Sequence, residues 1–254
     1  MRNRYRVFAA IVLVGALSGA TGAAPTSRVA LMELYTSEGC NSCPPMDMWV
    51  SRLPRPQFVP QKLVVLAFHV DYWNYLGWPD RFSQAGFTQR QHRSVRNNGL
   101  RTAYTPQLLL NGRDYRERGD IDTQVSRINA QTTPVHLALV IKESSPALKA
   151  SVLVKPQTKL GDGPVELYVA VYENNLQTQV QAGENRGQQL RHDYVVRSLI
   201  GPMVVAPNEP TRWEGTIPLR AEWKRADLGL AVFVQSESGE VLQATARPIR
   251  DLEF

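Results

Sequence analysis

The order of apolar and polar residues predicts alternating strands and helices over the first half of the chain. Nearly continuous apolar runs at residues 28–36 and 62–70 are typical of strands that are buried on both faces. Segments with helical spacing, bounded by prolines or by an Asn-Asn-Gly stop, follow these strands. The predicted elements are a strand at 28–36, a helix at 44–53, a strand at 62–70, a helix at 83–98, a strand at 107–110, a return strand at 114–117 and a helix at 120–131.

The second half has a different pattern, in which short β-rich runs are separated by Gly, Pro, Asn and Ser turns. Some seven such runs, with no convincing helix between them, are typical of an antiparallel sandwich. We therefore expect an α/β domain at residues 25–132 and an all-β, sandwich-like domain at residues 133–254. The runs lie at 135–141, 148–154, 165–172, 195–200, 211–219, 228–235 and 240–246.

The first residues of the chain have the pattern of a secretory signal peptide. A start rich in arginine is followed by an apolar run at residues 7–17 and by small residues up to position 24. The apolar run is shorter than the ~20 residues that span a bilayer. We expect residues 1–24 to be removed and the protein to be exported, either periplasmic or secreted, without stable membrane insertion. An uncleaved N-terminal anchor is the alternative.

Composition is that of a globular protein, with 43% hydrophobic and 20% charged residues in 254. Removal of the three arginines in the leader lowers the formal net charge from +6 to +3. The densest basic cluster is interpreted as a solvated helix face, and nothing resembles a nucleic-acid-binding module, so no nucleic-acid partner is expected. This cluster consists of the arginines at 81, 90, 93, 96 and 101.

The chain has two cysteines, Cys40 and Cys43, where a predicted strand meets a predicted helix. They pair with each other, bind a ligand together, or meet a cysteine of another molecule. A helix N-terminus favours the thiolate, so Cys40 is the expected nucleophile and Cys43 the resolving thiol of a disulfide exchange. An inert structural disulfide is one alternative, and a metal site, with His69 as a third ligand of Cu(I), is another.

Residues 25–132 resemble a thioredoxin fold in the buried strand before Cys40, in the Thr105-Pro106 pair that opens a later strand, and in the final helix. The whole mature chain also resembles a family of secreted bacterial thioredoxin-like proteins catalogued as a domain of unknown function. The motif departs from the Trp-Cys-Gly-Pro-Cys form, because Asn41-Ser42 fills its middle. The resemblance is carried by Leu34-Tyr35-Thr36-Ser37-Glu38-Gly39-Cys40, Ser42-Cys43-Pro44-Pro45, His69-Val70-Asp71-Tyr72-Trp73, Tyr75-Leu76-Gly77-Trp78, Tyr104-Thr105-Pro106-Gln107, Gly183-Glu184-Asn185-Arg186-Gly187 and Val195-Val196-Arg197.

The thioredoxin resemblance implies roles for further residues. Pro106 is expected to be a cis-proline that faces the cysteines. The backbone of Thr105 is expected to pair with an extended substrate, with Tyr104 beside it. Glu33, which interrupts the apolar strand before the cysteines, would relay the proton of the resolving thiol, and a structural, hydrogen-bonded Glu33 is the alternative.

An aromatic-rich insert at residues 69–78 is either a substrate groove or a second hydrophobic cluster. Trp73 and Trp78 are assigned to substrate binding. His69 and Asp71 are assigned to the same site, where they could serve in proton transfer.

Two other polar features are interpreted as loops. Glu38, beside the first cysteine, is interpreted as a solvated carboxylate. The dense polar group of Glu184, Asn185, His192 and Asp193 is interpreted as a turn-rich loop, because no reaction can be assigned to it.

Together these features predict an exported thiol-disulfide oxidoreductase that acts on protein or small-molecule thiols and disulfides. No cofactor is expected, since the cysteine pair itself carries two electrons. The alternative function is a non-catalytic thioredoxin-like binding module. In that case a static disulfide between Cys40 and Cys43 braces a surface that the second domain completes.

Overall fold

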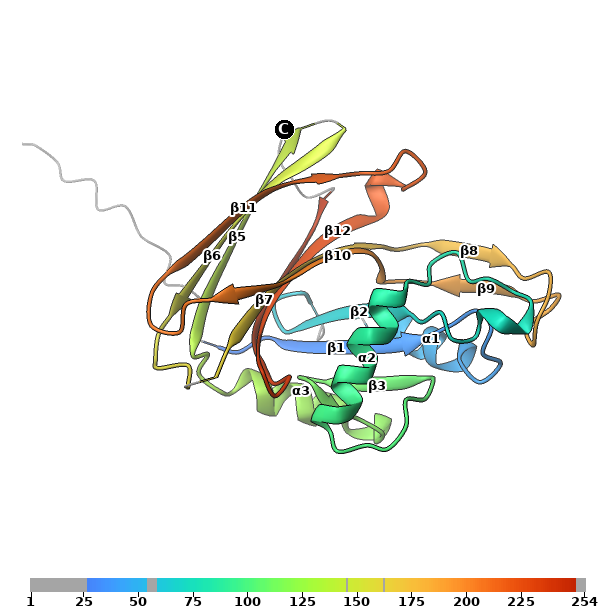
Figure 1. Ribbon diagram of the computed structural model, residues 1–254, viewed down its shortest axis with the longest axis horizontal. Helices are drawn as coiled ribbons and strands as arrows, with labels where there is room; N and C mark the ends of the chain where they lie inside the picture. The colour runs from blue at the N-terminus through green and yellow to red at the C-terminus, as the bar shows by residue number, and fades with distance from the viewer. Residues whose placement is uncertain (1–26, 54–58, 145, 162, 250–254) are drawn as a thin grey trace, which may run out of the picture.

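The computed structural model describes residues 27–53, 59–144, 146–161 and 163–249 (Figure 1). The expected signal peptide at residues 1–24 lies outside the described residues. Most predicted strands and helices lie within a few residues of their expected positions. Two short strands, β8 (Leu176–Gln179) and β9 (Gln189–His192), are absent from the prediction.

Helices and strands alternate in the first half, as the apolar pattern predicts. Pro44 and Pro45 occupy the first turn of the first helix, where a missing backbone donor costs little. The elements are β1 (Ala30–Thr36), α1 (Pro44–Ser51), β2 (Leu63–His69), the 3-10 helix η1 (Asn74–Leu76), α2 (Ala85–Asn97), β3 (Gln107–Leu110), β4 (Arg113–Asp114), the 3-10 helix η2 (Arg118–Asp120) and α3 (Ile121–Asn129).

The described part of the second half consists of strands and one short 3-10 helix. Besides β8 and β9, its elements are β5 (Val135–Ser144), β6 (Ala147–Pro156), β7 (Val165–Glu173), β10 (Val195–Val205), β11 (Thr211–Pro218), η3 (Arg225–Asp227), β12 (Leu228–Ser236) and β13 (Val241–Pro248).

Strands of both halves form one mixed eight-stranded sheet, with the order β13-β12-β7-β10-β2-β1-β3-β4. β10 pairs in parallel with β2, through Val195 opposite Ala67, and antiparallel with β7. The predicted fold class, an α/β thioredoxin-like domain followed by an all-β, sandwich-like domain, is therefore wrong. The protein is mostly β, and its main sheet runs through both halves. Apolar runs locate each strand, but no local sequence pattern predicts that β2 pairs with β10.

A three-stranded sheet of the order β11-β6-β5 packs against the second-half strands of the main sheet (Figure 1). Alternate residues of each strand point into a shared aliphatic core, where Val152 and Val154 of β6 lie with Val169 and Val232 of the main sheet. The hairpin of β8 and β9 forms a separate two-stranded sheet, and β9 contacts α1. The hairpin extends beyond the main sheet on the side of α1 (Figure 1).

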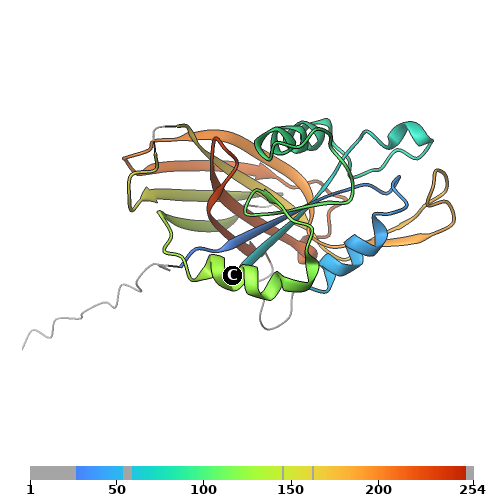
Figure 2. The same cartoon turned by 90° about the horizontal axis from the view of Figure 1, so that it is seen from below.

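Helices cover both faces of β1 and β2, which explains the continuous apolar sequences of these strands. Figure 2 shows α2 on one side of the strands and α1 and α3 on the other. Leu31 of β1 packs with Phe87 of α2, whereas Leu34 packs with Val50 of α1. The cysteine motif belongs to the α1 face, because Cys43 is the N-cap residue of α1.

A buried ion pair joins α2 to the main sheet. Arg90 Nε lies 2.8 Å from Glu33 Oε2, and the guanidinium of Arg90 stacks on the rings of Tyr168 and Phe233. Tyr35 donates a hydrogen bond to the same carboxylate oxygen at 3.1 Å. Burial and the adjacent carboxylate raise the pKa of Tyr35, so its hydroxyl stays protonated and acts as a donor.

We expect Arg90→Met to lower the free energy of unfolding by about 3–5 kcal/mol, because it leaves the carboxylate of Glu33 buried without a positive charge beside it. Urea denaturation measures this loss. Arg93→Met is the matched control on the same helix, since its side chain is 31% exposed and its ion pair with Glu166 contributes far less. The double variant Glu33→Met/Arg90→Met should recover most of the lost stability. A double variant as unstable as Arg90→Met would contradict this explanation.

Candidate functional site

Cys40 and Cys43 form a disulfide at the junction between β1 and α1. Their Cα atoms lie 5.4 Å apart, and the amide of Cys43 donates to the carbonyl of Cys40 at 3.2 Å, so the motif forms a tight turn. Ser42 Oγ lies 3.4 Å from Cys40 Sγ. Both cysteines are 0% exposed. The two thiols therefore pair with each other, and their bond is shielded from solvent.

Five ionisable side chains gather beside the cysteine motif, where the parallel strands β1 and β2 end together. All five residues are at most 6% exposed. We call them the buried cluster. Its members are Glu38 from the loop after β1, Asp47 from α1, His69 from the end of β2, Asp80 from the loop after η1, and His192 from the end of β9.

The two histidines of the buried cluster have different contacts. His69 Nδ1 lies 2.6 Å from Asp80 Oδ2, and the same oxygen accepts the amide of Glu38 at 2.8 Å. The ring of His192 lies edge-on to that of His69, with 4.9 Å between ring centres. His192 Nε2 is 3.4 Å from Glu38 Oε1, and its Nδ1 is 3.8 Å from Asp47 Oδ2. His69 is therefore tightly bound, whereas His192 has ion-pair contacts on both sides but no hydrogen bond.

Burial and charge contacts act against each other on these groups. Burial alone would lower the pKa of His69 and raise that of Asp80, but their mutual contact outweighs it, so the pKa of His69 is raised and that of Asp80 is lowered. Burial would also raise the pKa of Glu38, but hydrogen bonds and the nearby His192 lower it. For Asp47, burial outweighs both imidazoles and raises the pKa. Asp47 is thus the carboxyl of the cluster that most readily keeps a proton.

The aromatic insert lies against the cysteine motif. Trp78 Nε1 donates to Glu38 Oε2 at 2.8 Å. Trp73 packs on Gly39, where an added Cβ would lie 3.0 Å from Trp73 Cβ, and its Nε1 donates to Thr105 Oγ1 at 2.8 Å. The insert therefore links the motif to the segment that precedes Pro106. Binding of a substrate by Trp73 and Trp78 stays a prediction.

The Thr105–Pro106 peptide bond is cis, as the resemblance implies. The hydroxyl of the neighbouring Tyr104 donates to Asp114 Oδ1 at 2.7 Å. A cleft of about 330 Å³ borders this segment and the start of α1. The residues that line it are Met46, Tyr104, Pro106, Leu108, Tyr115, Arg116 and Arg118.

The two acidic residues of the predicted site, Glu33 and Asp71, are not part of the buried cluster. Glu33 lies on the opposite face of β1, where it is bound to Arg90. Asp71 accepts a hydrogen bond from Thr88 Oγ1 of α2 at 2.6 Å. The proton relay predicted for Glu33 and the substrate contact predicted for Asp71 stay predictions.

The turn of the β8–β9 hairpin covers the cysteine motif. Asn185 Nδ2 donates to the carbonyls of Glu38 and Cys40, at 2.8 Å and 3.0 Å. Glu184 Oε2 accepts the amide of Asn41 at 3.1 Å. Asn185 is itself fully buried. The hairpin therefore contributes both to the shielding of the disulfide and, through His192, to the buried cluster.

Sequence patterns do not reveal most of this arrangement. Asn185 and His192 belong to a polar group that is visible in the sequence, but its meaning depends on the unpredicted hairpin. Glu38 is buried, not solvated as predicted. Asp80 has no signal in the sequence. Asp47 does have one, because it follows the second cysteine by one helical turn.

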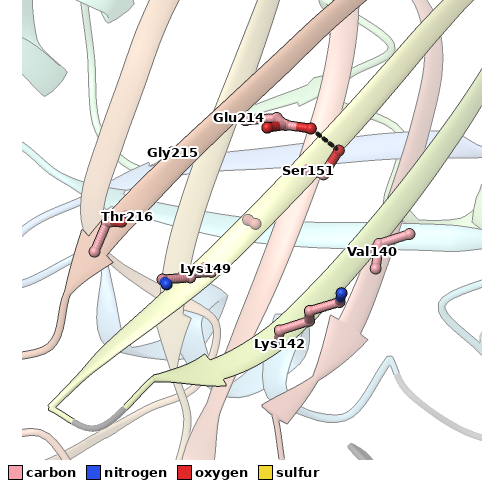
Figure 3. Close-up of a pocket in the computed structure, with 8 residues that line it drawn as sticks. Val140, Lys142, Lys149, Ser151, Glu214, Gly215 and Thr216 are labelled. Atoms are coloured by element: carbon pink, nitrogen blue, oxygen red, sulfur yellow. Dashed lines mark hydrogen bonds between the residues drawn. The ribbon is translucent and has the colours of Figure 1, made fainter.

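A second, shallow cleft of about 480 Å³ lies on β5, β6 and β11. Figure 3 shows Lys142 and Lys149 beside it, with a hydrogen bond from Ser151 to Glu214. No cysteine and no member of the buried cluster lines this cleft. The same holds for the cleft beside Pro106, but that cleft reaches the start of α1 through Met46.

Among the described residues, no three His, Cys, Asp or Glu side chains are arranged to hold a metal ion. In the same ranges, the helices are too short or too polar to cross a membrane.

The fold and the site define a mostly β protein that carries a buried Cys-x-x-Cys disulfide beside its main sheet. Residues 31–235 match the family described as "Protein of unknown function (DUF1223)", and the chain belongs to this family. Protein AGR_C_4864 from Agrobacterium tumefaciens has a similar structure, with 26% identity and a TM-score of 0.63, over 89% of this chain and 97% of that one. HBP35 of Porphyromonas gingivalis shares the fold, with 14% identity and a TM-score of 0.67, over 89% and 77% of the two chains. No curated protein matches the chain.

The pair of His69 and Asp80 should stabilise the protein most between about pH 4 and 6.5. The raised pKa of His69 gives stability that is complete below its unfolded pKa and is lost as the pH rises through its folded pKa. The lowered pKa of Asp80 gives stability that is present above its unfolded pKa and is lost as the pH falls through its folded pKa.

We therefore expect Asp80→Asn to lower the free energy of unfolding by about 1.5–3 kcal/mol at pH 5.5, the range for a hydrogen bond to a charged group. The loss should be smaller at pH 9 than at pH 5.5, because the stability that comes from the raised pKa of His69 is lost as the pH rises. Urea denaturation of both proteins at the two pH values measures it. The same loss at pH 5.5 and pH 9 would show that the ion pair does not contribute.

Proposed function

We propose that this protein is an exported thiol-disulfide oxidoreductase that acts on protein or small-molecule thiols and disulfides through Cys40 and Cys43. The observation that carries this proposal is the disulfide itself, which joins the two cysteines at the start of α1. The leader predicted at residues 1–24 supports export, and exported compartments allow disulfides to persist. The cysteine pair carries the two electrons, so the reaction needs no cofactor.

The exchange begins with attack of a substrate thiolate on Cys40 Sγ. A mixed disulfide forms between the substrate and Cys40, and the electron pair of the broken bond moves to Cys43 Sγ. Cys43 is the leaving group, and the positive end of the α1 dipole favours a thiolate at this N-cap residue. A second substrate thiol then attacks the mixed disulfide and releases Cys40.

The cleft beside Pro106 supports a peptide as the substrate. It joins the start of α1 to the cis-proline segment and combines apolar surface with two guanidinium groups. Tyr104 lines this cleft and would contact a chain lying in it, the backbone of Thr105 would pair with that chain, and the insert with Trp73 and Trp78 would border its path. His69, in the buried cluster, would serve this site in proton transfer.

A substrate can reach the disulfide only after a local movement, since both cysteines are 0% exposed. The turn with Asn185 is the segment whose displacement would uncover Cys40, because its amide group is bonded to the carbonyl of that residue. The β8–β9 hairpin forms no strand pairs with the other sheets, so it can move without breaking the main sheet. We therefore assign it the role of a cover.

The same shielding favours a second candidate function. A static brace also requires a disulfide that is fully buried and held by hydrogen bonds to the surrounding backbone, such as those from Asn185. In this case the protein is a non-catalytic binding module, and the bond between Cys40 and Cys43 holds the β8–β9 hairpin in place. The two functions differ in whether thiols exchange with the disulfide under native conditions.

Replacement of Cys40 by alanine should abolish both insulin reduction and oxidation of a reduced peptide by the mature protein. Replacement of Cys43 should instead trap a mixed disulfide with the substrate, because the resolving thiol is missing. Non-reducing gels and intact mass measure the trapped species. Met48→Ala, on the exposed side of α1, is the control that should keep the activity. Equal, partial losses in both cysteine variants would contradict the assigned order of attack.

Asn185→Ala should make the disulfide easier to reduce in the folded protein. Its two lost hydrogen bonds contribute about 1–3 kcal/mol, which corresponds to an open state that is about 5 to 160 times more populated. Reduction by dithiothreitol, followed by alkylation and mass measurement over time, gives the rate. Gln189→Ala is the control, since this exposed hairpin residue does not bond to the cysteine motif. An unchanged rate in Asn185→Ala would exclude the hairpin as the cover.

A further inference from the structure

We propose that Asp47, supported by His192, supplies and takes back the proton of the Cys43 thiol during disulfide exchange. This inference rests on the proposed oxidoreductase function and names the groups that handle its proton. Neither residue belongs to the site that the sequence predicts.

Asp47 follows Cys43 by one turn of α1. Its amide donates to the carbonyl of Cys43 at 3.1 Å, and residues four apart on a helix share one face. Its carboxyl group is shielded from solvent and accepts a hydrogen bond from Thr36 Oγ1 at 3.2 Å. The side chain is therefore held on the face of α1 that also holds the resolving cysteine.

His192 is the buried group that the rest of the structure does not explain. It is 2% exposed, and neither ring nitrogen has a hydrogen-bond partner. Buried polar groups without partners are rare because each loses its hydration without compensation, so such a group calls for an explanation. His192 lies between Asp47 and Glu38, with its ring nitrogens 3.8 Å and 3.4 Å from their carboxylate oxygens.

The charged groups around Asp47 and His192 come from the segments that pack against these two residues. Glu38 lies on one side of His192, and His69 lies edge-on with Asp80 behind it. The guanidinium groups of Arg81 and Arg197 stack on Phe82, whose ring also contacts both imidazoles. Three carboxyls and two imidazoles thus share one desolvated space.

Burial raises the pKa of Asp47, which allows it to hold a proton where an exposed aspartate would not. When a substrate thiolate attacks Cys40, the bond between Cys40 and Cys43 breaks and its electron pair moves to Cys43 Sγ. The proton of Asp47 moves to that sulfur, and the carboxylate that remains faces His192 Nδ1 at 3.8 Å. In the reverse direction, Asp47 accepts the proton as Cys43 attacks the mixed disulfide.

The first experiment is the titration of the single thiol in a Cys40→Ala background, followed by thiolate absorbance. With Asp47 present, the thiol and the carboxyl should titrate as a coupled pair. Asp47→Asn should leave one step and lower the thiol pKa by about one unit or more, because a nearby negative charge is removed. Asp47→Glu should restore the coupling. Glu173→Gln, which removes a fully buried carboxylate from β7, is the control and should leave the titration unchanged.

The second experiment is the rate of exchange between the two-cysteine protein and dithiothreitol as a function of pH. Asp47→Asn should slow the exchange near neutral pH by about a hundredfold, the range of general acid-base catalysis, and His192→Gln should slow it in the same pH range. His192→Gln also serves as the second variant where Asp47→Asn does not fold.

The outcomes separate the two proposals. A wild-type protein that exchanges, with an unchanged titration and pH profile in Asp47→Asn and His192→Gln, overturns the proton-transfer inference alone. The inference is also overturned if Glu33→Gln, and not Asp47→Asn, removes the coupled step. A wild-type protein that exchanges with no thiol overturns the proposed function, and the titration in the Cys40→Ala background then decides whether Asp47 and the thiol share a proton.

Discussion

The parallel pairing of β2 with β10 is the contact on which the candidate site depends. Val195 lies opposite Ala67, and the amide of Ala67 donates to the carbonyl of Tyr194 at 2.8 Å. β9 ends at His192, just before this contact, so the same register that joins the two halves of the sheet places His192 beside His69. The hairpin turn before β9 then reaches the cysteine motif. The site is assembled by the sheet as a whole and not by the first half alone.

Two groups of buried charges lie on opposite faces of β1, and they differ in how completely their polar atoms are bonded. Glu33 and Arg90 form a short ion pair whose cation is sandwiched between aromatic rings, which is the arrangement of a structural contact. In the buried cluster, His192 keeps two unbonded nitrogens, and Glu38 and His69 keep one unbonded atom each, whereas the ion pair keeps one, Nη1 of Arg90. Groups that must gain and lose protons cannot be bonded as fully as groups that only support the fold.

The elements of the fold are largely predictable from the sequence, whereas their assembly is not. Continuous apolar runs identify β1 and β2, and the prolines after Cys43 mark the start of α1, because these signals depend on neighbouring residues. The resemblance of Thr105-Pro106 to the thioredoxin pattern also predicts the cis peptide bond. The pairing of β2 with β10 and the contact of Asn185 with Cys40 join residues more than a hundred positions apart. The fold class and the cover of the site follow from those contacts, which explains why both are missing from the prediction.

The central claim is that the disulfide between Cys40 and Cys43 exchanges with thiols and is not a static brace. Equilibration of the folded protein with glutathione and dithiothreitol redox buffers, quenched by alkylation and read by mass, measures its reduction potential. We predict reversible reduction at a potential between about −120 and −270 mV, the range of catalytic cysteine pairs. A disulfide that stays oxidised below about −300 mV, as structural disulfides of secreted proteins do, would contradict the account.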